Sequence, residues 1–375
     1  MRFPEFKEEW KKYKVIDVLD FYSTNSLSWE QLDYDNEDLY NLHYGLIHVG
    51  LPILVDIGQN KLPGIKTECK PKNFELCKEG DVAFADASED TNDVAKAIEF
   101  VNLNNQKTVC GLHTIHGRDN KYLTVLGYKG YAFASPLFHN QIRRIAQGTK
   151  IYSISSKNFA ECYIGIPSKD EQSKIARLLA LIDSRIATQN KIIEQLQSLI
   201  KGIVVSITTE TPNTRIDKCL VCHSSTLQEN HIEDFGDFPV YGANGICGYT
   251  VNSDFKEPAI LIVKDGSGVG NVRFVNGKYS VIGTQNILTP QNRFCLKYIF
   301  YCLQAFNFMP YKTGMAIPHI YFKDYGKSKI YCPNFEQQVK IASQIDLIES
   351  KIEIETQLLN KYEEQKKFLL SNMFI

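Results

Sequence analysis

Two short strings in the sequence have the residue types and the spacing of a chemically active site. CLVCH at Cys219–His223 matches a c-type haem attachment string and half of a zinc knuckle, and GSGVGNVR at Gly266–Arg273 has the glycines of a phosphate-binding loop. Haem attachment follows export, for which the sequence has no signal, and zinc needs a second ligand pair, for which only His231 and Cys247 follow nearby. The glycine string lacks the Gly-Lys-Ser/Thr end and the strand-to-helix setting of a phosphate loop. We therefore expect packed cysteines and a β-turn, with no cofactor and no metal ion; metal binding stays the alternative for the cysteines.

Histidines and carboxylates offer a second kind of chemistry. His48, His113 and His116 could assemble with Asp86 into an acid–base site, but no nucleophile motif accompanies them. Surface or DNA-facing histidines are the interpretation that we favour. The sequence also contains no adjacent pair of prolines, so the Asp/Asn-Pro-Pro-aromatic motif of amino-methyltransferases is absent. These observations argue against an enzyme.

Charge is distributed unevenly along the chain, although the formal net charge is only -1. Residues 1–106 contain 11 Lys and Arg against 20 Asp and Glu. Residues 107–158 contain 8 against 1, and residues 260–332 contain 9 against 2. One such basic stretch is usually a solvated face. Two of them, in corresponding halves of the chain, indicate two surfaces that can neutralise phosphates.

Length and composition set the class of protein. A chain of 375 residues favours two or three domains. The sequence has neither a signal-peptide pattern nor an uncharged stretch of 18 residues, so we expect a soluble cytoplasmic protein that does not bind a membrane. Its 10 cysteines are then expected to be reduced core residues.

The elements that must position any site belong to an internal repeat. Residues 167–208 align without a gap on residues 333–374 at a constant offset of 166. In both copies apolar residues alternate at spacings of four and three, which predicts a long helix that packs on a partner helix. Polar breaks at Gln189 and Glu355 match, so we expect the two helices to pair antiparallel as a coiled coil. Two unrelated core helices are the alternative.

Weaker similarity precedes each helix. HYGLIHVG at His43–Gly50 parallels VYGANGICG at Val240–Gly248, and GLHTI at Gly111–Ile115 parallels GTQNI at Gly283–Ile287. Short segments rich in Val, Ile, Tyr and Phe, bounded by Gly, Asn and Asp, predict strands and turns. We expect an α+β protein of two globular heads, each followed by a long helix. The boundaries that we expect are 1–166 for the first head, 167–210 for a central helix, 211–332 for the second head and 333–375 for a C-terminal helix.

The sequence resembles the specificity subunits of type I restriction-modification systems. The segments that carry the resemblance are Ile166–Ile186, Phe238–Thr250, Ala259–Val272, Glu79–Asp90 and Arg2–Trp10, which with the two helices cover nearly the whole chain. The resemblance implies a pseudo-twofold, non-catalytic protein in which two target-recognition domains each read one half of an asymmetric bipartite site in double-stranded DNA.

The resemblance also implies a role for the helices and for partner proteins. The helices would set the spacer between the half-sites and dock two DNA methyltransferase subunits, while a separate restriction and translocase subunit cuts and moves DNA. The first head is some thirty residues longer than the second, so the heads are expected to read different half-sites. Two alternatives remain. One is an enzyme, either a methyltransferase or a fused restriction enzyme, and the other is a coiled-coil interaction scaffold with ligand-binding heads.

Candidate DNA contacts follow from side-chain chemistry in the two basic stretches and the matching segments. Lysine and arginine can neutralise phosphates, arginine can pair with guanine, and asparagine and glutamine can pair with adenine. Tyrosines can stack or bond to the DNA backbone, and the histidines can face the DNA. In the first head the candidates are Tyr44, His48, His113, Arg118, Lys121, Arg143, Arg144 and Lys150; in the second they are Tyr241, Asn244, Lys264, Arg273, Gln285, Asn286 and Lys312.

Overall fold

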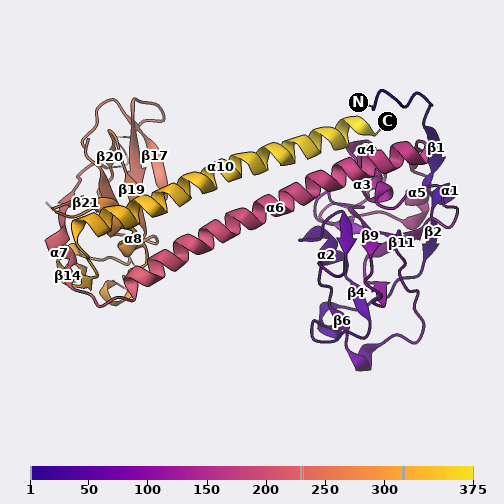
Figure 1. The fold of residues 1–375 in the computed structure, drawn as a ribbon, viewed down its shortest axis with the longest axis horizontal. Helices are drawn as coiled ribbons and strands as arrows, with labels where there is room; N and C mark the ends of the chain where they lie inside the picture. The colour runs from indigo at the N-terminus through magenta and orange to yellow at the C-terminus, as the bar shows by residue number, and fades with distance from the viewer. Residues whose placement is uncertain (1, 229, 231, 292, 315–316, 375) are drawn as a thin grey trace. The chain divides into compact units, whose positions relative to one another are not determined.

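The structure is a computed structural model that describes every residue except 1, 229, 231, 292, 315–316 and 375. The chain forms two compact units, which Figure 1 colours by residue number. Unit 1 comprises Met1–Gln189 and Leu358–Ile375, and unit 2 comprises Asn190–Gln357. Both units contain β-sheets and helices, as the α+β class predicts.

Unit 1 is built on a five-stranded sheet with the order β2-β11-β7-β9-β5 and a four-stranded sheet with the order β10-β4-β6-β3. The larger sheet is antiparallel except for the parallel pair β5 and β9, and β10 runs parallel to β4. The strands are β1 (Lys11–Lys14), β2 (Asp20–Tyr22), β3 (Leu32–Asp33), β4 (Tyr40–Leu42), β5 (Leu54–Asp56), β6 (Gly64–Ile65), β7 (Val82–Ala85), β8 (Ala87–Ser88), β9 (Ala97–Asn102), β10 (Thr108–Cys110), β11 (Thr114–Arg118), β12 (Tyr152–Ser153) and β13 (Tyr163–Ile166).

Short helices cover the larger sheet of unit 1. The side chain of Ser135 accepts a hydrogen bond from Phe138 N, and Pro136 occupies the first turn, so both residues favour a helix start there. The core beneath is aromatic, with Phe84 packed on Phe133 and Phe159. The helices are α1 (Val15–Val18), α2 (Tyr44–His48), α3 (Tyr128–Phe133), α4 (Pro136–Ile145) and α5 (Ser156–Ala160), with 3-10 turns η1 (Trp29–Gln31) and η2 (Thr67–Cys69).

Unit 2 repeats this plan with fewer strands. Its four-stranded sheet has the order β15-β21-β18-β19, and its three-stranded sheet has the order β17-β16-β20. The elements are β14 (Thr214–Arg215), α7 (Ile216–Cys219), β15 (Leu220–Ser224), β16 (Phe238–Gly242), β17 (Gly245–Thr250), β18 (Ala259–Val263), β19 (Val272–Val275), β20 (Ser280–Val281), β21 (Gln285–Pro290), α8 (Leu296–Gln304), η4 (Met309–Tyr311), α9 (Phe322–Tyr325) and β22 (Lys329–Ile330).

The two heads share one topology. The order β2-β11-β7-β9 corresponds to β15-β21-β18-β19, and each neighbouring pair is antiparallel in both heads. The parallel pair β4 and β10 corresponds to the parallel pair β16 and β20, and the antiparallel pair β1 and β13 corresponds to β14 and β22. The internal repeat read from the sequence is therefore a repeat of the fold. Unit 1 has an extra strand, β5, at the edge of the larger sheet.

Both long helices that the heptad pattern predicts are present, as α6 (Lys169–Thr208) and α10 (Phe335–Met373). In unit 1 the end of α10 lies beside the start of α6 (Figure 1), with an ion pair of 2.6 Å between Lys366 and Asp183. The hydroxyl of Tyr362 lies 3.5 Å from Arg185, so residue numbers rise along one helix as they fall along the other. In unit 2, Ile207 near the end of α6 belongs to one apolar cluster with the first turns of α10. The expected antiparallel pairing is confirmed.

Each long helix is joined to its head by the same hydrogen bonds. They explain why Pro167 and Gln172 recur in the second copy of the repeat as Pro333 and Gln338. Gln172 donates to Pro167 O at 2.9 Å and accepts from Val125 N at 2.9 Å. Gln338 donates to Pro333 O at 2.7 Å and accepts from Cys295 N at 3.0 Å. Tyrosines add to this joint, since Tyr131 donates to Asp183 in unit 1 and Tyr301 donates to Asp346 and Glu349 in unit 2.

Replacing the buried glutamine of unit 1 is expected to destabilise the chain. Gln172→Leu leaves the Val125 amide and the carbonyls of Leu123 and Pro167 without this partner, so we expect the free energy of unfolding to fall by about 1–3 kcal/mol. Thermal unfolding measures the change. Ser173→Leu, at the exposed neighbouring position, is the control and should change stability by no more than about 0.5 kcal/mol. Equal unfolding temperatures for Gln172→Leu and the wild type would contradict this account.

Among the described residues, no helix combines the length with the apolar composition that crossing a bilayer requires.

Candidate nucleic-acid interface

In the first head, aromatic rings and imidazoles gather around α2. This aromatic–histidine cluster consists of Trp29, His43, Tyr44, His48 and His113. The ring centroids of Trp29 and His43 lie 4.3 Å apart, those of His43 and Tyr44 4.7 Å, and those of Tyr44 and His113 5.2 Å. His43 caps α2 by accepting a hydrogen bond from Gly45 N, and its burial lowers its pKa, so it stays neutral near pH 7.

A cavity of about 460 Å³ opens beside this cluster. Its lining is partly acidic, and it is formed by Tyr44, His48, Ala87, Ser88, Glu89, Asp90, Asp93, His113 and Ile151. His113 lies at a positive φ of 54° and contacts Asp86 at 3.1 Å through Nδ1, while His48 Nε2 contacts Ala87 O at 2.9 Å. Carboxylates repel phosphate but accept hydrogen bonds from the amino group of cytosine. The cavity is therefore suited to the edge or face of a base.

Basic side chains stand around this cavity. Arg143 and Arg144 are exposed in the last turn of α4, and Arg143 donates to Asn92 at 2.9 Å, close to the acidic lining. Lys150 is exposed next to Ile151, which lines the cavity. Tyr44, His48, His113, Arg143 and Lys150 are thus gathered on neighbouring segments of one head.

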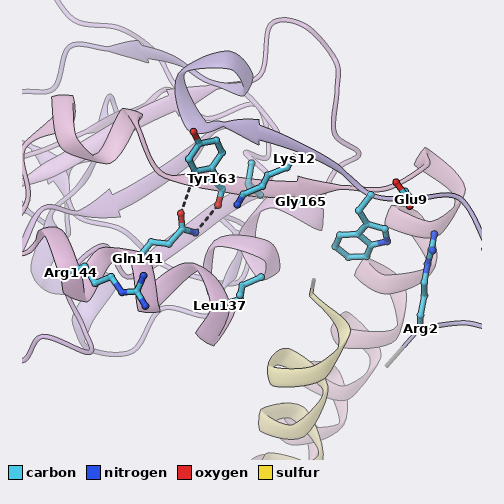
Figure 2. A pocket seen from close by; sticks show the side chains of 10 residues that line it. Arg2, Glu9, Lys12, Leu137, Gln141, Arg144, Tyr163 and Gly165 are labelled. Carbon is cyan, nitrogen blue, oxygen red and sulfur yellow. Dashed lines mark hydrogen bonds between the residues drawn. The ribbon is translucent and has the colours of Figure 1, made fainter.

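A second cavity of the first head, of about 680 Å³, is shown in Figure 2. Arg144 reaches it from α4 and Lys12 from β1, and Arg2 lies at its other end. Gln141 fixes its floor by two hydrogen bonds of 2.8 Å with the backbone of Tyr163. Lys12 and Arg144 could contact a phosphate, whereas Arg2 is paired with Glu171 at 2.7 Å and Glu9 also lines the cavity, so its charge is mixed.

Two predicted DNA contacts of the first head, Arg118 and Lys121, instead bond to groups of the protein. Arg118 is only 7% exposed and is not a DNA contact, because Asp81 accepts from its Nε and Nη2 at 2.8 Å and Glu75 accepts from its Nη1 at 2.8 Å. Lys121 is exposed, but its Nζ donates to Asp17 O at 2.7 Å. The acid–base grouping is not formed either, since His116 is buried against Asp81, whereas His113 pairs with Asp86.

In the second head, the candidates gather at the turn between β16 and β17. Asn244 is exposed in this turn, and Tyr241 precedes it at the end of β16. The guanidinium of Arg273, on β19, lies 3.4 Å from where a Cβ at Gly245 would stand. Gly245 has a φ of +129°, so its backbone conformation favours glycine, whereas a Cβ would make only an ordinary contact with Arg273.

Two loops complete this surface. The glycine string is the turn between β18 and β19, as expected, and a Cβ at Gly268 would lie 3.9 Å from Ala243 in the β16–β17 turn. Lys264 follows β18, and its carbonyl accepts from Ile320 N at 2.9 Å. Lys312 is exposed at the start of the same segment, which closes with paired bonds between Thr313 and His319. Asn244, Lys264 and Lys312 on loops, together with Arg273 on β19, therefore lie on neighbouring segments.

Two candidates of the second head are structural residues. Gln285 is 2% exposed and donates to Tyr241 O at 3.0 Å, and Asn286 is 5% exposed and donates to the Tyr325 hydroxyl at 3.0 Å. Neither amide is available to pair with adenine. Gln285 instead holds the strand that leads into the β16–β17 turn.

The cysteine string is partly packed. Cys219 is buried with its Sγ 3.8 Å from Cys332 Sγ, Cys222 is half-buried, and His223 contacts Thr289 at 2.9 Å. His231 lies outside the described residues. Within the part of the chain that the structure describes, this string does not belong to a group with metal-ligand geometry.

Comparison with known protein families gives a consistent result. A family model described as the type I restriction modification DNA specificity domain matches residues 118–198 and 221–364. The chain is 25% identical over 279 residues to a putative type I specificity subunit of Mycoplasma genitalium, a match that covers 66% of this chain and 70% of the relative. It is 26% identical over 109 residues to the specificity subunit of the type I restriction enzyme EcoprrI of Escherichia coli, which covers 29% of this chain and 27% of that subunit.

Solved structures share the fold. The crystal structure of a type I restriction-modification S subunit from M. genitalium matches with a TM-score of 0.63 at 18% identity, over 100% of this chain and 97% of that one. A structure described as showing complex assembly and conformational transition of the type I restriction-modification system matches with a TM-score of 0.57 at 13% identity, over 98% of this chain and 97% of that one.

Proposed function

Because the chain belongs to the type I restriction modification DNA specificity family, whose model matches more than half of its residues, we propose that it reads an asymmetric bipartite DNA site for a type I restriction-modification complex. Each head contacts one half-site in double-stranded DNA. The chain itself carries out no catalysis. It supplies sequence recognition to DNA methyltransferase subunits, two of them by the symmetry of its repeat, and to restriction and translocase subunits.

One observation carries this proposal: the heads share a scaffold but differ in the side chains that it presents. The loop after β7 begins with Asp86, which contacts His113, whereas the loop after the equivalent strand β18 begins with Lys264. The first head thus offers carboxylates, imidazoles and Tyr44, and the second offers Arg273, amide groups and lysines. Similar scaffolds with different hydrogen-bonding groups would select different bases, as an asymmetric target requires.

The long helices support the proposed separation of the half-sites. α6 has 40 residues, which corresponds to about 60 Å at 1.5 Å per residue. Half-sites one turn of DNA apart lie about 34–36 Å from centre to centre. A helix of this length is long enough to set such a spacing, and it leaves exposed polar positions along α6 and α10 for the partner subunits.

Methylation mapping tests the proposed function. The chain is expressed with its methyltransferase subunits in a host that lacks other modification systems, and the genome is sequenced for methylated bases. We expect one motif with two different specified halves and an unspecified spacer. A continuous motif, or methylation that is unchanged when the chain is omitted, would refute the proposal. Binding of S-adenosylmethionine by the isolated chain would instead support the methyltransferase alternative.

A further inference from the structure

The first head contains a buried polar cluster that DNA recognition does not use. The side chains of Asp81 and His116 are 0% exposed, and Asp81 Oδ2 lies 2.7 Å from His116 Nε2. Burial alone would raise the pKa of Asp81, but the hydrogen bonds from His116 and Arg118 outweigh it and lower that pKa. In the second head, the position of β21 that corresponds to His116 is Ile287, which is fully buried. The fold therefore does not require a histidine here.

The contacts of His116 leave one ring nitrogen unused. Nε2 faces the Asp81 carboxylate, and in the neutral ring this contact keeps the proton on Nε2. Nδ1 then carries a lone pair, is buried, and has no hydrogen-bond partner within the described chain. An unpaired buried polar atom costs about 1–3 kcal/mol. A histidine that donates to a carboxylate and presents its other nitrogen as a lone pair is the usual arrangement of a metal ligand.

Two thiols lie next to this imidazole. Cys77 and Cys110 are both buried, with their Sγ atoms 3.6 Å apart. The hydrogen bond from Cys77 N to Thr108 O, at 2.8 Å, holds the first thiol against β10, which ends at Cys110. The ligand atoms of Cys77, Cys110 and His116 all lie within 4.8 Å of one another. Two thiolates bound tetrahedrally to zinc at 2.3 Å would have their sulfurs about 3.8 Å apart.

We propose that Cys77, Cys110 and His116 bind a divalent cation of the zinc class, with Asp81 orienting the imidazole. Two thiolates and a neutral imidazole balance the charge of such an ion, so the occupied site carries no net charge in the core. The fourth tetrahedral position remains for a water molecule. Of the three ligands, Cys110 alone also lines the neighbouring cavity of about 510 Å³.

The position of the site gives the ion a structural role. Cys110 ends β10, His116 lies on β11, and the short connection between them carries His113, a member of the aromatic–histidine cluster. A bound ion would fix both ends of this connection. It would also join β10 and β11 to the segment before β7, which contains Cys77. Removal of the ion is therefore expected to loosen the first head and leave the second unchanged.

Cobalt titration of the full chain tests the site. The chain is purified under reducing conditions, freed of metal with a chelator, and titrated with Co²⁺, whose tetrahedral thiolate complexes absorb strongly. We expect cobalt–thiolate absorption that saturates at one ion per chain and is displaced by Zn²⁺. A chain that binds no cobalt, or that binds it without thiolate absorption, overturns the proposal.

Matched variants locate the site. Cys77→Val with Cys110→Val, and separately His116→Ile, which copies the residue of the second head, should each abolish the absorption or weaken cobalt binding at least tenfold. The control is Cys219→Val with Cys332→Val, because that pair has its sulfurs 3.8 Å apart but belongs to no group with metal-ligand geometry in the described chain. The control should bind cobalt as the wild type does. Loss of binding in the control alone would overturn the assignment.

A measurement on the wild type tests the site even if the variants fail to fold. Alkylation of the native chain, followed by mass spectrometry, reports each cysteine separately. We expect Zn²⁺ to slow the modification of Cys77 and Cys110 at least tenfold, and to leave the rate at exposed Cys247 unchanged. Equal rates at Cys77 and Cys110 with and without Zn²⁺ would refute the site.

Discussion

Removing one heptad from each long helix is expected to shorten the spacer of the DNA target by about three base pairs without changing either half-site. Seven helical residues span about 10 Å, which is close to the rise of three base pairs. The matched deletions are residues 187–193 of α6 and residues 353–359 of α10, which stand in the same register of the repeat. In α6 the apolar seam stays continuous, because Leu196 then takes the place of Gln189 three residues after Ile186.

Methylation mapping with the shortened chain measures the result. The heads are untouched, so the specified bases of both halves should be those of the wild type. The control is Gln189→Leu with Glu355→Leu, which removes the same polar breaks at full length and should keep the original spacing. Methylated sites with new half-site bases at the original spacing would show that the helices do not set the separation.

The helices were the most predictable part of this chain. A heptad seam is a local pattern, and it correctly predicted α6 and α10 as well as their pairing. Each helix begins two residues after a proline, Pro167 or Pro333, and these prolines occupy matching positions of the repeat. Ser168 and Asn334 are the capping residues, since their side chains accept from Glu171 N and Gln337 N.

Residue type alone could not predict which candidate side chains are exposed. Arg118, Gln285 and Asn286 have the chemistry of DNA contacts, yet all three are buried, because their strands are covered on both faces. Alternation of apolar and polar residues along a strand identifies the exposed side chains only where one face of the sheet is in contact with water. The strands of these heads are too short and too deeply buried to show it.

The sequence also could not predict which residues far apart along the chain lie together in the fold. Trp29 and His43 belong to the aromatic–histidine cluster although neither was a predicted DNA contact. The similarity of His43–Gly50 to the second head indicated the region of His43, and nothing in the sequence indicated Trp29. Cys77 and Cys110 are 33 residues apart in the sequence, which is not the short spacing that identifies a metal-binding motif. Parallel pairing of β4 with β10, and the bond that ties Cys77 to β10, bring these groups together only in the folded chain.

Removing positive charge from one head is expected to weaken recognition of one half-site only. Arg143→Ala with Arg144→Ala changes the exposed end of α4 in the first head. In the second head, Arg273→Ala with Lys312→Ala changes the side chain beside Gly245 and the exposed lysine before Thr313. If a double change removes two phosphate contacts, the slope of log binding constant against log salt should become shallower by about two. Affinity should then fall for all sequences alike.

A base contact has a different signature, and it distinguishes the two roles of arginine. If Arg273 pairs with a guanine, Arg273→Ala should lose about 1–3 kcal/mol of discrimination, or roughly 5- to 150-fold, at one position of the second half-site. Binding of the complex to DNA with single base changes in each half-site, at low and at physiological salt, measures both effects. Each double variant serves as the control for the other, because the half-site of the unchanged head should be read as in the wild type. Binding that neither double variant alters at either salt concentration would remove these four side chains from the interface, and the acidic cavity beside Tyr44 would remain as the surface to test.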